Sequence, residues 1–356
     1  MDIDNFILKN VFLTQGIRIF FMGAISFLIS LIISFFVIEI LKKIKFGKQI
    51  REEGAPIYYS IHKKKEGTVT GGGISFIFSI VLITFFLLIL DKKFGGFWSF
   101  LNYFSRSEVY LPFLMMILAG LVGFVDDILG ILKIGPKGGG IGWKEKFIIY
   151  FALGFFITWW FYAKLSRDTL FLPFLGEIDL GFFYFIFNLF VILGSIHGAN
   201  LTDGLDGLLI GVSVPAFLSL ILISFFNTYF NLATFLTVFL ASILGFLWFN
   251  FYPAKSFIGD VGSVSIGVLI GTVSSMLNIQ FYLLFFVFVF VIEALSVIFQ
   301  VFSKKFFNKK IFLSTPIHHH FEALGIEEPN IVFKFWLINS LFCILGLIIY
   351  FMSKFF

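Results

Sequence analysis

The sequence is poor in charged residues and in cysteine, and both shortages narrow the class of protein. Charged side chains make up 13% of the 356 residues, whereas hydrophobic side chains make up 59%; soluble domains carry about a quarter charged residues. Cys343 is the only cysteine and lies in an apolar run, which excludes a disulfide framework and argues against a cysteine-based metal site. No proline- or serine-rich linker and no large polar block interrupts the chain. The composition therefore indicates a single polytopic membrane domain over residues 1–356.

Long apolar runs dominate what is present. A hydrocarbon core of roughly 30 Å needs about 20 apolar residues per helix. Runs of suitable length predict about ten transmembrane helices, at 20–41, 72–90, 109–125, 147–163, 180–196, 205–226, 232–252, 262–278, 281–302 and 331–352. The first run is too long for a cleavable signal peptide and no small-residue cleavage site follows it, so we expect no cleaved leader. The predicted fold class is an all-α integral membrane protein.

The loops between these runs differ in charge from one side of the membrane to the other. Seventeen of the 26 Lys and Arg residues fall in the odd-numbered loops, and eight fall in the termini and the even-numbered loops. Because positively charged loops stay in the cytoplasm, the odd-numbered loops are predicted to be cytoplasmic and both termini to lie outside. The net charge of +5 mostly reflects this bias. It suits membrane lipid headgroups and anionic substrates, and no nucleic-acid-binding signature accompanies it.

Nearly all the chemically useful residues fall in the same five odd-numbered loops. Their sequences are HKKKEGTVTGGG (62–73), VDDILGILK (125–133), ANLTDGLDG (199–207), NFYPAKSFIGDVGS (250–263) and STPIHHHFE (314–322). This distribution is typical of a membrane enzyme with an active site in its cytoplasmic loops. A cation-coupled transporter or channel would instead place ionisable residues along a path through the membrane, where only Glu39, Glu293 and Gln300 are candidates.

Acidic residues in three of these loops predict a divalent cation site. Asp126 and Asp127 follow an apolar run, and Asp260 lies in a Gly-flanked turn. Asp203 and Asp206 are three apart, which puts both on one face if the sixth helix starts there. Mg²⁺ typically takes one or two carboxylates, with substrate phosphates and waters completing its shell. A Mg²⁺ ion shared with a phosphate is therefore expected, although Asp also caps helices without any metal.

Glycine, lysine and histidine supply the remaining candidates. The glycine-rich stretch 67–73, beside the lysines at 63–65, could present backbone N–H groups to an anion, but it is not a Walker A motif. The three consecutive histidines at 318–320 would splay by about 100° each on a helix, which suits hydrogen bonding or proton transfer near a diphosphate better than a tridentate metal site. His62 and His197 are expected to be structural.

These motifs together resemble the polyprenyl-phosphate N-acetylhexosamine-1-phosphate transferase superfamily over almost the whole chain. The superfamily features are the Asp126–Asp127 pair, the NxxDGxDGL string at 200–208 and the FxGDxGS turn at 257–263. Other segments are similar to its phospho-N-acetylmuramoyl-pentapeptide transferase (MraY) branch: IREEGAP (50–56), the HKKKEGT approach, EALSVIFQ (293–300), PIHHHFE (316–322) and EEPNIVFKFW (327–336).

The resemblance implies an activity. Enzymes of this branch use Mg²⁺ to move phospho-MurNAc-pentapeptide from UDP-MurNAc-pentapeptide onto undecaprenyl phosphate, which yields lipid I and UMP in peptidoglycan synthesis. The resemblance further implies a homodimer in the bacterial cytoplasmic (inner) membrane, with the active site facing the cytoplasm. The alternative within the superfamily is a UDP-GlcNAc:polyprenyl-phosphate GlcNAc-1-phosphate transferase. The three-histidine string and the 327–336 segment argue against that alternative.

The resemblance also implies roles for single residues. Asp260 resembles the Mg²⁺ ligand, and Asp126 resembles the residue that engages the lipid phosphate with support from Asp127. His319 joins these three as a catalytic candidate. The residues expected to contact substrate are Lys65, Thr70, Lys133, Asn200, Asp203, Leu205, Asp206, Asn250, Phe257, Gln300, His318 and His320. Direct transfer and a route through an aspartyl-phosphate both stay open.

The chain departs from the family pattern at three places. Residues 68–73 read TVTGGG where the family commonly reads TPTMGG. Gly130 stands where the family has the lysine of DDxxK, which leaves Lys133 as the nearest positive charge. An extra IYYSI stretch (57–61) lengthens the first cytoplasmic loop. These departures concern Lys133 and the first loop, and they leave the reaction class unchanged.

Overall fold

The computed structural model describes residues 3–47, 63–136 and 139–355, and most of these residues are helical. The segments 50–56 and 57–61 and His62 lie outside the described residues. Within the described part, nine helices are long and apolar enough to cross a membrane, and a bent helix pair would bring the number to ten. The predicted all-α membrane fold class is thereby confirmed.

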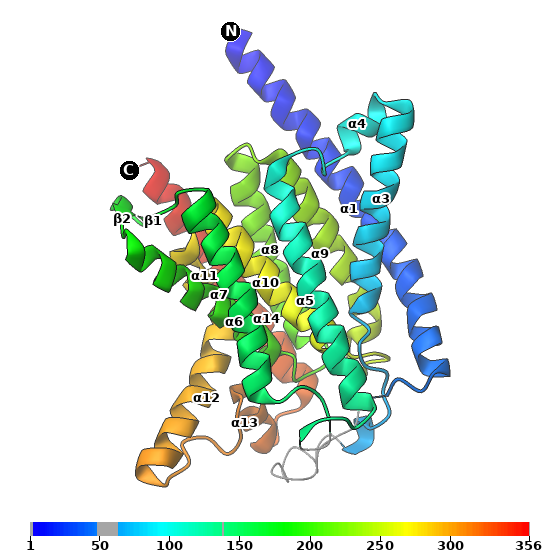
Figure 1. Cartoon of the computed structure of the whole chain (residues 1–356), viewed down its shortest axis with the longest axis vertical. Coiled ribbons are helices and arrows are strands. Elements are labelled where there is room, and N and C mark those ends of the chain that lie inside the picture. The colour runs from blue at the N-terminus through cyan, green and yellow to red at the C-terminus, as the bar shows by residue number, and fades with distance from the viewer. Residues whose placement is uncertain (1–2, 48–62, 137–138, 356) are drawn as a thin grey trace.

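The helices form an elongated bundle with their axes roughly along its length (Figure 1). The long helices are α1 (Ile3–Lys43), α3 (Ile74–Phe94), α5 (Ser107–Ile131), α6 (Trp143–Trp159), α7 (Phe182–Thr202), α8 (Leu208–Phe226), α9 (Phe230–Asn250), α10 (Gly259–Leu277), α12 (Phe288–Phe307) and α14 (Glu328–Phe355). The short elements are η1 (Lys63–Lys65), α4 (Phe97–Leu101), η3 (Trp160–Lys164), η4 (Gln280–Tyr282), α11 (Leu283–Phe286) and α13 (Ile317–Ala323).

The two ends of the bundle differ in content. Both termini, α4 and a short antiparallel hairpin of β1 (Thr169–Leu172) and β2 (Gly176–Asp179) lie at one end (Figure 1). The opposite end carries α13, the last turns of α1 and α5, and the loops with the polar motifs. The hairpin was not among the elements expected from the sequence, because its short strands fall between two apolar runs.

Helix α10 lies in the interior of the bundle. Of its most apolar 18-residue stretch, 89% is buried, against 28% for the corresponding stretch of α5. Glycines allow α5 and α7 to approach it closely. A Cβ on Gly123 would overlap the Asp260 carbonyl, and a Cβ on Gly267 would lie 2.6 Å from the Ser195 carbonyl oxygen. Small residues at membrane helix contacts permit such backbone approach, and here the approach brings the end of α5 against the start of α10.

Two predicted helix boundaries need correction at the loop-bearing end. Helix α5 continues to Ile131, so Asp126 and Asp127 lie in its last turns and not after its end. Helix α8 begins at Leu208 and not at residue 205. The expectation that Asp203 and Asp206 share a helix face is therefore wrong, because both lie in the loop that joins α7 to α8.

The predicted single helix over 281–302 is also wrong. The pair formed by 280–286 and α12 is bent by 87° at Val287. Asn339 on α14 satisfies the backbone at this break: its Oδ1 accepts the Val289 N–H at 3.1 Å, and its Nδ2 donates to the Phe286 carbonyl at 3.0 Å. A broken helix at membrane depth is stable only when its freed backbone groups find such partners. Helix α12 consequently projects away from the bundle (Figure 1).

Candidate active site

Carboxylates from α5 and α10 meet around one lysine at the loop-bearing end. The Lys146 ammonium, on the first turn of α6, lies 2.8 Å from Asp126 Oδ2 and 2.7 Å from Asp260 Oδ2. From α7, Asn200 Nδ2 donates to Asp260 Oδ1 at 3.1 Å. Four helices therefore converge on a few ångströms of space, and these side chains form what we call the carboxylate cluster, together with Asp127.

Asp127 binds the backbone at the start of α10, next to Asp260. Its Oδ1 accepts the Asp260 N–H at 3.2 Å and its Oδ2 accepts the Val261 N–H at 3.1 Å. These amides belong to the first turn of α10, where helical N–H groups have no intrahelical partner. Gly259, at φ 73°, must lack a side chain, because a Cβ would overlap the Asp127 carboxylate. Asp127 thus fixes the position of Asp260, whereas its predicted support of Asp126 stays a prediction.

The donor set of the carboxylate cluster suits a hard divalent cation. The cluster holds three carboxylates and one ammonium, so its local charge is negative when all are ionised. In the described part of the chain, no group of three or more His, Cys, Asp or Glu is arranged to hold a metal. Mg²⁺ does not need such a cage, because it usually takes one or two carboxylates and completes its octahedron with phosphate and water. Asp260 and Asp126 are the residues that would hold it, and in this structure their oxygens accept from Lys146, Asn200 and the Ile141 N–H.

A second cluster surrounds Lys65, which lies in the predicted first cytoplasmic loop. Its Nζ lies 2.6 Å from Asp206 Oδ1 and 2.6 Å from Glu328 Oε1. Glu328 Oε1 also accepts the Asp206 N–H at 2.7 Å. The same ammonium lies 5.9 Å from the ring centres of Tyr252 and Phe257, within the range of a cation–π contact. A partly buried cation, two acids and two aromatic rings therefore lie together here.

Three further predicted residues are buried in the walls of these clusters. Asn250 Oδ1 accepts the Gly207 N–H at 3.2 Å, and its Nδ2 donates to the Ser256 carbonyl at 3.0 Å. The Leu205 and Thr70 side chains are buried. In this structure these three side chains stabilise the conformation of the loops. Asp203 lies at the end of α7 and is partly exposed.

The histidines of α13 have different neighbours. His318 Nδ1 lies 3.1 Å from Glu293 Oε1 and both side chains are fully buried, so His318 is shielded from solvent. Its ring also fills the space beside Gly204, where a Cβ would overlap it. Gln300, seven residues after Glu293 on α12, binds the backbone of residues 311–312. Both α12 side chains therefore anchor the last loop.

The other two histidines face other partners. His319 Nδ1 lies 2.6 Å from Glu322 Oε2, and both residues are buried. His320 Nδ1 accepts the Leu313 N–H at 3.2 Å. His197 packs among the rings of Phe147 and Tyr150, which agrees with its expected structural role.

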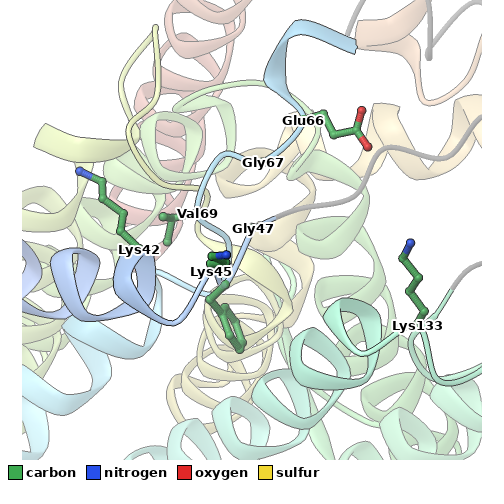
Figure 2. Close-up of a pocket in the computed structure, with 8 residues that line it drawn as sticks. Lys42, Lys45, Gly47, Glu66, Gly67, Val69 and Lys133 are labelled. Atoms are coloured by element: carbon green, nitrogen blue, oxygen red, sulfur yellow. The ribbon is translucent and has the colours of Figure 1, made fainter.

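Lys133 also lies away from both clusters, and two residues of the clusters were missed. Lys133 lines a separate pocket beyond the end of α5 (Figure 2), whereas Lys146 makes the contacts with the carboxylates. Lys146 was counted only as a loop charge, and Glu328 was noted only as part of a motif. Nothing in the local sequence of either distinguishes it, because Asp260 lies 114 residues from Lys146 and Asp206 lies 122 residues from Glu328 in the chain.

Known proteins are similar to this chain over the same region and beyond it. The family model described as Glycosyl transferase family 4 matches residues 109–278, which include the whole carboxylate cluster. The phospho-N-acetylmuramoyl-pentapeptide-transferase of Staphylococcus carnosus is 38% identical, over 92% of this chain and 98% of its own length. Those of Clostridium perfringens (38%; 90% and 95%) and Bacillus subtilis (36%; 93% and 97%) are similarly related.

Proposed function

The chain belongs to the phospho-N-acetylmuramoyl-pentapeptide-transferase family, and on that premise we propose that it transfers phospho-MurNAc-pentapeptide from UDP-MurNAc-pentapeptide to undecaprenyl phosphate. The products are lipid I and UMP, in peptidoglycan synthesis. The observation that carries the proposal is the contact of Lys146 with both Asp126 and Asp260. It supports phosphoryl transfer, because that chemistry depends on positioning and charge neutralisation more than on covalent steps by the protein.

In the proposed mechanism the carboxylate cluster handles the reacting phosphates. A bound Mg²⁺ supplies neutralisation of phosphate charge, with Asp260 as its proposed ligand. Asp126 engages the lipid phosphate, and Asp127 keeps Asp260 in place through its two backbone hydrogen bonds. Lys146 holds Asp126 and Asp260 at a fixed separation and offers a positive charge to an incoming phosphate. His319 stays a catalytic candidate on the resemblance alone, and in this structure its Nδ1 lies 2.6 Å from Glu322 Oε2.

The cluster around Lys65 is the proposed nucleotide pocket. Lys65 offers a cation to the diphosphate, and Phe257 offers a ring face to the uracil. Glu328 and Asp206 hold the ammonium of Lys65 from two sides, so the cation stays oriented before substrate arrives. A pre-oriented group loses less conformational freedom on binding.

We also propose the orientation in the membrane. The loop-bearing end faces the cytoplasm and the end with both termini faces outside, because the lysine-rich loops gather at the former. A soluble nucleotide substrate and a lipid phosphate can meet only at such an interface. A homodimer in the cytoplasmic membrane remains a prediction from the resemblance.

The test is UMP release by purified protein with undecaprenyl phosphate and Mg²⁺. UDP-MurNAc-pentapeptide and UDP-GlcNAc are compared as donors. Release with the first alone supports the proposal. Release with UDP-GlcNAc alone would make the protein a GlcNAc-1-phosphate transferase, which its relatives do not favour. Absence of release from folded protein with both donors would contradict the whole proposal.

A further inference from the structure

A polar cavity lies beyond the end of α5, apart from the carboxylate cluster, and the proposed reaction does not use it. Its volume is about 440 Å³. Figure 2 shows it between the end of α1, the segment 66–69 and the chain just after α5. Eight residues line it: Lys42, Lys45, Phe46, Gly47, Glu66, Gly67, Val69 and Lys133. We call it the lysine pocket, because three of these eight side chains are cationic and one is acidic.

Two of the lysines occupy a backbone position that normally holds glycine. Lys45 and Lys133 both have φ 57° and both lie just past a helix end. The Phe46 N–H donates to the Leu41 carbonyl and the Ile134 N–H donates to the Leu129 carbonyl, which closes the same C-terminal turn on α1 and on α5. A side chain is unfavourable in this conformation. The chain nevertheless places a lysine at both turns, and both line one cavity.

Within the residues that the structure describes, these two lysines make no ion pair, although Glu66 lines the same cavity. Across residues 3–47, 63–136 and 139–355, no ion pair joins Lys45 or Lys133 to a carboxylate. Lys42 pairs with Glu39 on its own helix, where both side chains are about half exposed. Like charges that share a cavity repel one another, so an anion in the cavity would relieve an unfavourable arrangement.

The lysine pocket is also preformed. Phe46 and Val69 are buried at its base, and the Phe46 ring stacks on Phe124 of α5 with centroids 6.1 Å apart. A small apolar cluster of Leu41, Phe46 and Val69 packs against α5 side chains, including Ile131. The ends of α1 and α5 are therefore held at a fixed separation. The cations need no large rearrangement to receive a ligand.

The surroundings point to the membrane as the source of that ligand. Ile40 and Ile44 on α1 are 58% and 61% exposed, and Leu132 and Ile134 beside Lys133 are 60% and 55% exposed. Exposed apolar residues next to lysines, at the ends of two membrane-spanning helices, are what an acyl chain and its headgroup would contact together. Basic pockets between transmembrane helices bind anionic headgroups. We propose that the lysine pocket binds the phosphate group of an anionic membrane phospholipid.

The experiment measures lipid binding to the full-length protein in neutral detergent by native mass spectrometry. The probes are phosphatidylglycerol, phosphatidylcholine and inorganic phosphate. The test variant is the double substitution Lys45→Asn and Lys133→Asn, because asparagine tolerates the left-handed conformation. The charge-retaining counterpart carries Lys45→Arg and Lys133→Arg. Lys43→Asn, which removes an exposed charge from the last turn of α1, is the matched control.

The expected result is preferential binding of phosphatidylglycerol over phosphatidylcholine. Each lysine near an anionic headgroup contributes about five-fold in affinity, so the double asparagine variant should bind phosphatidylglycerol about 25-fold more weakly. The arginine variant and Lys43→Asn should stay within about two-fold of the parent. Unchanged binding by the asparagine variant would overturn the proposal, as would equal loss in the arginine variant, because shape and not charge would then matter. Displacement of the lipid by millimolar inorganic phosphate would assign the pocket to a soluble anion.

Discussion

Replacement of Lys146 by glutamine tests whether its ammonium and a bound Mg²⁺ share the carboxylate cluster. Lys146 is the cation that contacts both Asp126 and Asp260. Its removal leaves these carboxylates facing each other without an intervening charge. We expect two opposite effects: turnover falls, because a positive charge at the phosphates is lost, and Mg²⁺ binds more tightly, because its nearest competitor is gone.

The size of the second effect follows from the geometry. Two unit charges about 5 Å apart interact by roughly 3 kcal/mol at an effective dielectric constant of about 20. The side chains of Lys146, Asp260 and Asp126 are 25%, 21% and 12% exposed, so solvent screening reduces this to about 1–2 kcal/mol. The Mg²⁺ concentration for half-maximal activity should therefore fall about ten-fold. Turnover should fall about 100-fold, which is the usual loss when one charge-stabilising group is removed.

The assay is UMP release against Mg²⁺ concentration at saturating substrates. The matched control is Lys144→Gln, which removes an exposed lysine from the same helix turn and should change neither quantity. A thermal unfolding midpoint close to that of the parent would establish that the glutamine variant is folded. If folded Lys146→Gln needed as much Mg²⁺ as the parent, or more, Lys146 and the metal would not share the cluster.

Three other substitutions give distinct readouts. Asp260→Asn should abolish UMP release while the nucleotide donor still binds in a calorimetric titration; retained turnover would remove Asp260 from the metal-ligand role. Glu328→Gln should raise KM for the nucleotide donor about ten-fold with little change in kcat, because Lys65 loses one of its two charged partners at 2.6 Å; an unchanged KM would separate Lys65 from the donor. Gly204→Ala should lower the free energy of unfolding by about 1–3 kcal/mol, because the new methyl group would overlap the buried His318 ring. The control Gly194→Ala has open space around it and should leave the thermal midpoint unchanged.

Hydrophobicity alone predicted most of the fold. Each long helix corresponds to an apolar run, because the bilayer requires the same length of apolar residues from every spanning helix. The break at Val287 was not predictable in this way. The run around it is continuously apolar, and the residue that compensates the break, Asn339, lies on another helix. Tertiary partners of this kind leave no trace in a local pattern.

The carboxylate cluster was predicted in part. Asp126, Asp127 and Asp260 were expected at one interface, and the close packing of α5 on α10 does bring them together. Lys133 was the nearest lysine in sequence, yet the turn after α5 directs it into the lysine pocket. Lys146 reaches the carboxylates because α6 begins beside them. Sequence distance was a poor guide here, since each loop returns to the same end of the bundle.

The burial of α10 has a consequence for how the protein enters the bilayer. A helix recognised by the insertion machinery on its own must be apolar enough to prefer lipid to water. The mean hydropathy of the most apolar 18-residue stretch is 1.5 in α10, against 2.6 in α3 and 2.4 in α8, because the small and hydroxyl-bearing residues of α10 serve helix packing and not lipid contact. Helix α10 is thus among the candidate membrane spans that are least able to insert into the bilayer on their own. Its partners α5 and α7 are synthesised before it, so we expect α10 to enter the membrane against helices that are already in place.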